Sequence, residues 1–269
     1  MRAVFFYICV MSNKNPIGFF DSGVGGISIW KEVHQLLPNE NTIYLADSKN
    51  APYGQRTKED IIRLSCKNVD YLLERDCKLI VVACNTATTN AIKELRAKYS
   101  VPIIGIEPAI KPAANQTKTE AIGILATKGT LNSELFHKTV ANYKHINIIE
   151  QVGYGLVQLI ENGDLESDEI KELLKTYLKP MVEANIDYLV LGCTHYPFLL
   201  PQIKEIIPAH IKIIDSGEAV ARQTKNVLEQ NNLLNTTEAE STHLFYTNYK
   251  SQVLKNISGF SANVFETDF

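Results

Sequence analysis

The chain has 269 residues, of which 45% are hydrophobic and 21% charged, and its formal net charge is −3 at pH 7. This length allows one large domain or two smaller ones, while the slight acidity provides no basic surface for nucleic acid. No apolar run approaches the roughly 20 residues that a membrane span requires. The five cysteines lack paired spacing, so we expect no disulfide framework and a reducing, cytoplasmic location.

The first ten residues, MRAVFFYICV, superficially match a signal peptide, because a positive residue precedes a short apolar run. No small-residue cleavage site follows, and NKNPIGFFDSG begins almost at once. We therefore interpret residues 1–10 as a frayed tail or a wrongly included upstream extension, with Met11 as the more economical start.

Strand-like apolar runs alternate with segments of helical spacing along the chain. In the first part we expect strands at 16–23, 42–48 and 78–84, with helices at 27–37 and 59–75. Further strands are expected at 120–127, 146–153, 187–193 and 211–217, each followed by a helix or a loop. Near-continuous Ile/Val/Leu strands separated by helices are typical of parallel sheets covered on both faces. The predicted fold class is α/β.

The stretch FFDSGVGGISIW runs from a strand through a glycine turn into a helix. Ser28 stands where a dinucleotide fingerprint needs glycine, and no Gly-Lys-Ser/Thr follows, so both nucleotide motifs fail. The turn can instead hold a small anion such as a carboxylate on its backbone N–H groups, with Asp21 and Ser22 facing the same cavity. It can equally be a plain helix start with flexible glycines.

A second loop, ADSKNAPYGQRT at 46–57, contains the turn signal Pro52-Tyr53-Gly54. A tyrosine and an exposed N–H on such a loop can line a polar pocket. Taken alone, the pattern predicts only a loop.

Two thiols occupy the same pattern 109 positions apart, Cys84 in VVACNTATTNAI and Cys193 in VLGCTHYPFLLP. Both stretches continue through a polar turn and a helix to a strand that ends in an acid, Glu107 or Asp215. Any two βαβ units look somewhat alike, but cysteines in register favour an internal repeat. We predict two similar α/β lobes, each with a thiol at the carboxyl end of a strand, where open α/β sheets place their ligand sites.

We expect each of these cysteines to begin its helix, where the helix dipole lowers a thiol pKa from about 8.5 toward neutrality. His195 could pair with or orient the Cys193 thiolate. Cys9, Cys66 and Cys77 lack such settings, and the last two are expected to be ordinary buried residues.

Four interpretations of the thiol pair compete. A zinc site would need a fourth ligand, and none is evident. A redox disulfide would usually show Cys-x-x-Cys, which is absent here. Two cysteines that serve only as small buried hydrophobic residues would not explain why both occupy the same place in the repeat. An acid–base pair fits best, because one thiolate can remove a proton from one face of a carbon while the opposite thiol donates to the other. Inversion of a stereocentre requires that geometry.

Together, GFFDSGVGG, ADSKNAPYG, VVACNTAT and LGCTHYPFL resemble the glutamate racemase family of cofactor-independent amino-acid racemases, over roughly residues 16–265. Aspartate and hydantoin racemases share the paired cysteines but generally not this whole set. The resemblance implies interconversion of L- and D-glutamate without pyridoxal phosphate or metal, as a supply of D-glutamate for peptidoglycan. It also implies a bacterial, cytoplasmic homodimer.

The resemblance further implies roles for individual residues. Cys84 and Cys193 match the two acid/base thiols, acting on the D- and L-enantiomer respectively. Asp21 and His195 match residues that assist them, and Glu161 matches a further catalytic acid. The implied substrate contacts are Asp21, Ser22, Tyr53, Gly54, Asn85, Thr86, Thr194 and His195, with Thr127 and Thr130 as additional carboxylate contacts.

The implied domains are 11–107 plus 217–269 for the first lobe and 108–216 for the second, with the active site between them. The C-terminal segment then returns to the first lobe. Two alternatives stay open, namely racemisation of another acidic amino acid such as aspartate, and a non-catalytic binding protein with the same fold.

Overall fold

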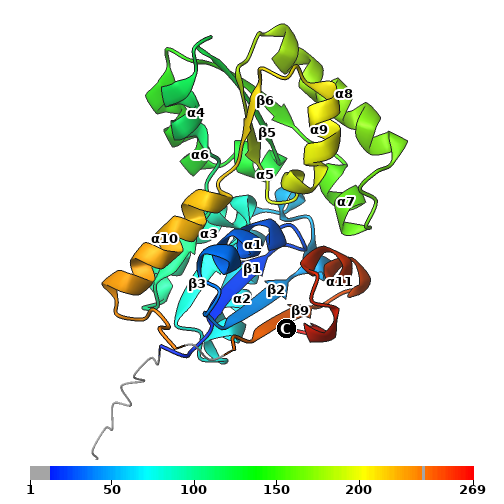
Figure 1. Ribbon diagram of the computed structural model, residues 1–269. Helices are drawn as coiled ribbons and strands as arrows, with labels where there is room; N and C mark the ends of the chain where they lie inside the picture. The colour runs from blue at the N-terminus through cyan, green and yellow to red at the C-terminus, as the bar shows by residue number, and fades with distance from the viewer. Residues whose placement is uncertain (1–12, 238–239) are drawn as a thin grey trace, which may run out of the picture.

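The computed structural model describes residues 13–237 and 240–269. The interpretation of residues 1–10 and Met11 therefore lies outside the described residues. Two lobes stand one above the other (Figure 1), each built on its own parallel sheet. The first sheet contains β1 (Ile17–Asp21), β2 (Thr42–Ala46), β3 (Leu79–Val82), β4 (Ile103–Gly105), β9 (His243–Thr247) and β10 (Val264–Glu266). The second contains β5 (Ala121–Ala126), β6 (Asn147–Val152), β7 (Tyr188–Gly192) and β8 (Lys212–Ile214).

The two sheets repeat one strand order. The first runs β10-β9-β2-β1-β3-β4 and the second β6-β5-β7-β8, so the order β2-β1-β3-β4 recurs in the second lobe. Strand β3 leads to Cys84 and β7 to Cys193, which occupy equivalent places in the two lobes. The predicted α/β class and the two pseudo-symmetric lobes are confirmed.

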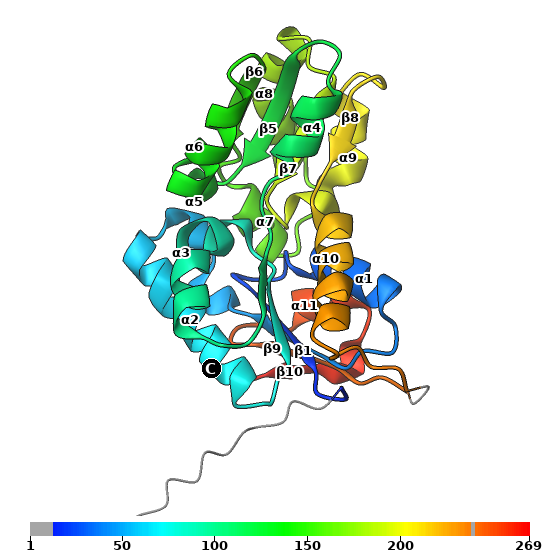
Figure 2. The ribbon, with the colours of Figure 1, turned by 90° about the vertical axis from the view of Figure 1, so that its left-hand side faces the viewer.

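Helices cover both faces of the first sheet (Figure 2), with α1 and α10 packed together on one side and α2 and α3 on the other. The first-lobe helices are α1 (Ile27–Leu36), α2 (Lys58–Leu73), α3 (Asn85–Lys98), α10 (Gly217–Gln230) and α11 (Gln252–Ser258). The second-lobe helices are α4 (Ile110–Gln116), α5 (Lys128–Leu131), α6 (Glu134–Val140), α7 (Leu156–Glu161), α8 (Asp168–Glu183) and α9 (Leu200–Ile206). In the part of the chain that the structure describes, no helix is long and apolar enough to cross a bilayer.

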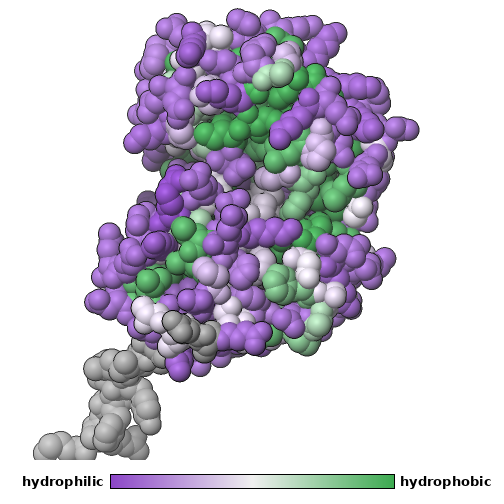
Figure 3. Space-filling view, viewed as in Figure 1, coloured by the Kyte–Doolittle hydropathy of each residue, from purple (hydrophilic) through white to green (hydrophobic). Residues whose placement is uncertain are grey.

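Burial explains why the central strands read as continuous apolar runs. Every residue of β1, β2, β3, β5 and β7 is buried, whereas β6 lies at a sheet edge and is partly exposed. Polar side chains cover most of the surface in Figure 3, and apolar ones reach it mainly over the second lobe. A strand covered on both faces has no polar side, so its sequence loses the alternation of a half-exposed strand.

The C-terminal strands were not predicted from the sequence. Strand β9 pairs in parallel with β2, and β10 pairs with β9, so the chain end extends the first sheet. The segment YKSQVLKNISGF, which carries no diagnostic motif, contains α11. Strand β9, HLFYT, mixes polar with apolar residues, and β10 has only three residues, so neither forms the apolar run by which the central strands were predicted.

The chain crosses between the lobes twice, from β4 to α4 and from β8 to α10. Glu107 and Asp215, the two acids that the internal repeat aligned, lie in these crossings. The Ser216 hydroxyl donates to the Glu107 carbonyl and thereby joins the crossings to one another.

A cluster of rings on the first lobe contains two histidines, the half-buried His34 and the buried His243. The ring of His34 on α1 stacks on Trp30, and its centroid lies 4.4 Å from that of His243 on β9. Burial lowers the pKa of both histidines, that of His243 to about 4, with the neighbouring His34 as a further cause. Protonation would place a charge among Trp30 and Phe260.

Acid is therefore expected to weaken this cluster. A histidine whose pKa is lower in the folded than in the unfolded chain contributes full stability above the unfolded value of about 6.5 and loses it as pH falls through the folded value. Urea unfolding between pH 7 and pH 4 should show a steeper loss for the wild type than for His243→Asn. His145→Asn, at an exposed position, serves as control. Equal slopes for wild type and His243→Asn would contradict the assignment.

Candidate active site

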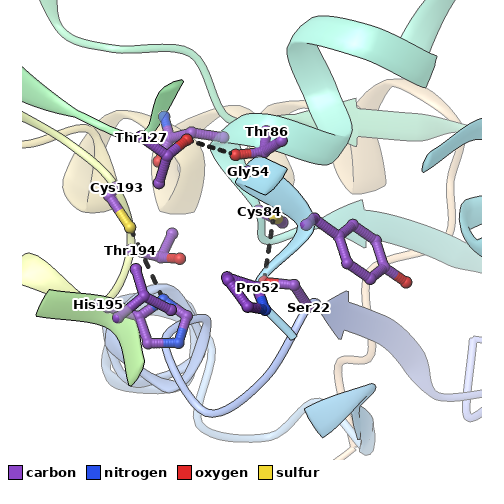
Figure 4. A pocket seen from close by; sticks show the side chains of 12 residues that line it. Ser22, Pro52, Gly54, Cys84, Thr86, Thr127, Cys193, Thr194 and His195 are labelled. Carbon is purple, nitrogen blue, oxygen red and sulfur yellow. Dashed lines mark hydrogen bonds between the residues drawn. The ribbon is translucent and has the colours of Figure 1, made fainter. Parts of the chain in front are cut away.

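One small cavity lies between the lobes and contains both repeat thiols (Figure 4). Its lining residues are Ser22, Pro52, Tyr53, Gly54, Cys84, Asn85, Thr86, Thr127, Val157, Cys193, Thr194 and His195. The cavity measures about 10 Å³, roughly what a single water molecule needs. Asp21, Glu161 and Thr130 lie behind the lining and bond to residues in it. The fold thus brings every candidate site residue to one place.

Cys84 caps the N-terminus of α3, as expected. Its Sγ accepts the Ala87 N–H at 3.4 Å and lies 3.7 Å from the Ser22 hydroxyl. The expected lowering of its pKa is wrong for this arrangement. Burial, followed by the nearby Asp21 carboxylate, raises the pKa of the Cys84 thiol well above its usual value and outweighs both hydrogen bonds. Burial therefore favours the protonated form of the first-lobe thiol.

Cys193 does not begin an α-helix, and that expectation is wrong. Strand β7 ends at Gly192, and a short 3-10 turn, Tyr196–Leu199, separates the thiol from α9, which begins at Leu200. The fourth residue after Cys193 is Pro197, which has no N–H to donate to the Cys193 carbonyl, so the Tyr196 N–H bonds there instead at 3.1 Å. The two lobes therefore share their strand order but differ in the segment after each thiol.

A histidine and a carboxylate stand behind Cys193. His195 Nδ1 lies 3.7 Å from the Cys193 Sγ, and Nε2 lies 2.6 Å from Oε1 of Glu161. Burial by itself lowers the pKa of His195. The contacts with Cys193 and Glu161 raise it by more than burial lowers it, so the pKa of His195 lies well above its usual value. The imidazolium form is thus favoured between the thiol and the carboxylate.

Asp21 links the end of β1 to the second lobe. Its carboxylate accepts the Gly23 N–H at 3.0 Å and the Thr194 hydroxyl at 3.2 Å. Burial raises the pKa of Asp21 to about 6, against the opposing charge of His195. Asp21 also acts electrostatically on Cys84.

The backbone N–H groups of the glycine turn bind carboxylates, but these carboxylates are side chains of the protein itself. The Gly23 N–H donates to Asp21, and the Val24 N–H donates to Glu161 at 2.6 Å. A Cβ added at Gly23 would lie 1.9 Å from Oε1 of Glu161, and one at Gly25 would lie 2.2 Å from Nδ1 of His195. Glycine is needed at both positions because these side chains approach the backbone so closely.

The remaining candidates differ in where their polar groups point. The Tyr53 hydroxyl donates to Asp47 and accepts from Asn68, so it is engaged away from the cavity. Both polar side-chain atoms of Asn85 are buried, and neither has a partner among the described residues. The hydroxyls of Thr86, Thr127 and Thr130 lie within 2.7 to 3.2 Å of one another and join the lobes above Cys84. Of these groups, Asn85, Thr86 and Thr127 line the cavity and are best placed to meet a ligand, whereas Thr130 lies behind them.

Possible metal ligands among the described residues are the His, Cys, Asp and Glu side chains. Within residues 13–237 and 240–269, no group of three or more His, Cys, Asp or Glu side chains is arranged to hold a metal ion. The described cysteines Cys66, Cys77, Cys84 and Cys193 are free thiols. Cys77 is buried and Cys66 half-buried, and neither lines the cavity.

A family model described as Asp/Glu/Hydantoin racemase matches residues 25–224. The chain belongs to this racemase family. It is therefore an isomerase, and the resemblance seen in its motifs is confirmed.

Curated relatives of this family match more than four fifths of the chain. A glutamate racemase of Pseudomonas syringae pv. tomato is 42% identical over 254 residues, covering 93% of this chain and 92% of the relative. One from Herpetosiphon aurantiacus is 47% identical over 221 residues, covering 82% and 87%.

Solved structures of the family share the fold. Glutamate racemase RacE1 of Bacillus anthracis has a TM-score of 0.85 at 30% identity and covers 96% of this chain and 98% of its own. Escherichia coli glutamate racemase, in complex with L-glutamate and the activator UDP-MurNAc-ala, has a TM-score of 0.81 at 32% identity, covering 94% and 97%.

Sequence reasoning missed three groups that help to build this site. The Ser48 hydroxyl donates to Glu161 at 2.9 Å, the Val24 N–H donates to the same carboxylate, and the Ser28 hydroxyl donates to the Thr194 carbonyl at 2.9 Å. Ser48 lies within the motif ADSKNAPYG, but nothing local marks its partner. Each contact joins segments more than a hundred positions apart, which only the assembled lobes can reveal.

Proposed function

We propose that the protein interconverts L- and D-glutamate without a cofactor, with Cys84 and Cys193 acting on opposite faces of the substrate Cα. The observation that carries this proposal is one buried cavity lined by two thiols from equivalent strands of two lobes. The names of the relatives support glutamate as the substrate.

In the L-to-D direction, the Cys193 thiolate takes the proton from Cα, and the electron pair of the broken C–H bond moves into the carboxylate group. The Cys84 S–H then donates its proton to the opposite face of Cα, which forms the new C–H bond and leaves a thiolate on Cys84. The His195 imidazolium provides positive charge beside Cys193, and Glu161 orients the ring. The raised pKa of Cys84 suits it to begin as the donor.

The substrate carboxylates need donors, and α3 offers them. Helix geometry leaves the first N–H groups of α3 without intrahelical partners, and its dipole favours an anion there. The Asn85 amide and the hydroxyls of Thr86 and Thr127 add side-chain donors at the same end of the cavity. Fixed donors of this kind stabilise the charge that develops when the Cα proton leaves.

Glutamate requires more room than the cavity has, so the lobes must separate to admit it. We propose residues 11–107 with 217–269, and residues 108–216, as the two units that move. The grouping of strands into two sheets and the packing of α10 on α1 support these limits. Closure would exclude water and strengthen the contacts around the reacting carbon.

The proposed product indicates a biological setting. D-Glutamate would supply peptidoglycan synthesis and hence the cell wall, in the bacterial cytoplasm, and the active form would be a homodimer. Supply of D-glutamate by this protein predicts that cells lacking it need D-glutamate for growth.

Circular dichroism of L- and D-glutamate with the purified protein tests the function. We expect the signal of either enantiomer to decay to zero without added cofactor and in the presence of a chelator, with deuterium from D2O appearing at Cα. Faster inversion of aspartate would reassign the substrate. Tight binding of glutamate without inversion or deuterium uptake would favour a non-catalytic binding protein.

A further inference from the structure

The Glu161 carboxylate contacts both lobes at once. Glu161 is the last residue of α7 in the second lobe, and its Oε1 faces His195 of that lobe at 2.6 Å. The Val24 N–H at 2.6 Å and the Ser48 hydroxyl at 2.9 Å reach it from the first lobe. The group that orients His195 is thus itself held from the opposite lobe.

The two first-lobe donors differ in what they hold. Val24 donates to Oε1, the oxygen that already faces His195, whereas Ser48 donates to Oε2. A carboxylate held through both oxygens cannot rotate without breaking a bond. Ser48 therefore determines the plane of the carboxylate and the direction in which Oε1 meets the imidazole.

The loop that carries Ser48 is anchored independently of the cavity. Asp47 is buried and accepts from the Tyr53 hydroxyl, from Asn50 and from Asn248 after β9. The Lys49 N–H donates back to the Asn248 side chain at 2.9 Å. Contacts on both sides of Ser48 thus fix its place before the second lobe closes on it.

We propose that Ser48 is a positioning residue, which orients Glu161 and through it His195 and Cys193 when the lobes close. This proposal rests on the proposed racemase function. Closure and assembly of the Cys193 half of the site then become one event, because Glu161 meets Ser48 and Val24 only across the interface.

Ionisable groups from several elements face this carboxylate. His195 lies on its own lobe and contacts Cys193 through its other ring nitrogen, while Asp21 at the end of β1 and Tyr44 on β2 act on the carboxylate from the first lobe. The contact with Glu161 helps to raise the pKa of His195, so a carboxylate turned away from the ring is expected to let that pKa fall. Loss of the Ser48 hydroxyl is therefore expected to move the alkaline limb of the pH profile to lower pH.

Kinetics of Ser48→Ala, Ser48→Thr and the control Ser241→Ala test the proposal. Ser241 also loses hydroxyl contacts when replaced by alanine, but it lies away from the cavity beside His243. We expect Ser48→Ala to lower kcat/KM about tenfold to a hundredfold, a typical penalty for a misplaced catalytic group. The decrease in kcat/KM must be the same for L- and D-glutamate. The two enantiomers have equal free energy, so the ratio of their kcat/KM values equals an equilibrium constant of 1 in every variant.

Ser48→Thr should restore most of kcat/KM together with the wild-type pH profile, and Ser241→Ala should match the wild type. Unchanged kinetics and pH profile in Ser48→Ala would overturn the proposal, and so would a loss that threonine fails to rescue. Nitrogen NMR of the imidazoles gives a readout that needs no turnover. A His195 resonance that titrates identically in wild type and Ser48→Ala would overturn the positioning role, whereas inactivity of the wild type would overturn the function alone.

Discussion

Cys84→Ser and Cys193→Ser are each expected to lower kcat/KM for glutamate by about 10³-fold or more, consistent with the 10²- to 10⁴-fold range of general acid–base catalysis. A serine hydroxyl keeps the shape of the side chain but neither gives up nor takes a proton near neutral pH as a thiol can. Each thiol lies alone on its side of the cavity, so neither can substitute for the other. Circular dichroism of both enantiomers measures the loss.

Deuterium uptake distinguishes the two faces in the same variants. With Cys84 replaced, the remaining Cys193 should still exchange the Cα proton of L-glutamate with D2O without inverting it. With Cys193 replaced, only D-glutamate should exchange. Cys66→Ser, on α2 and outside the cavity, is the matched control and should racemise as the wild type does. Full activity in either cavity variant would show that the thiols are structural and the mechanism is wrong.

Lys78→Met is expected to lower the free energy of unfolding by about 3 to 5 kcal/mol, the usual effect of removing one partner from a buried ion pair. Lys78 Nζ lies 2.6 Å from Oε2 of Glu40, and the two side chains are 0% and 2% exposed. The same ammonium donates to the Asn13 carbonyl, and the other Glu40 oxygen accepts the Asn235 N–H at 2.8 Å. Methionine would leave the Glu40 charge buried without its cation.

Urea unfolding of three variants measures this effect. The double variant Glu40→Gln with Lys78→Met should recover much of the loss, because no unpaired charge stays buried. Lys98→Met removes a half-exposed pair with Asp70 and should change stability by at most about 1 kcal/mol. A single Lys78→Met variant as stable as Lys98→Met would show that the buried pair adds nothing.

Local pattern alone was enough to place the main elements of the first lobe. The strand expected at 16–23 is β1, the helix expected at 59–75 is α2, and the strand expected before Cys84 is β3. Helix α2 is long, β3 is wholly apolar, and β1 is apolar up to Asp21 at its end, so the pattern of each segment allows one interpretation. The three-residue strand β10 offers no such pattern and was missed.

Some errors came from signals that were present in the sequence. Pro197 stands four residues after Cys193 and rules out the helix that the repeat suggested. Other errors had no local signal. The pKa of Cys84 depends on burial and on Asp21, both of which arise only when β1 and β3 lie side by side.

By itself the sequence determined the α/β class, the internal repeat and the two thiols at equivalent strand ends, because these depend on hydrophobic period and residue type within short segments. Only the tertiary structure decided that Tyr53 turns its hydroxyl to Asp47, that the glycine turn binds Glu161, and that Ser48 reaches the same carboxylate. The last two of these contacts cross the lobe interface and join residues that are remote in the chain. Which residues become hydrogen-bond partners there depends on how the two folded lobes pack against each other, and a local sequence pattern carries no information about that packing.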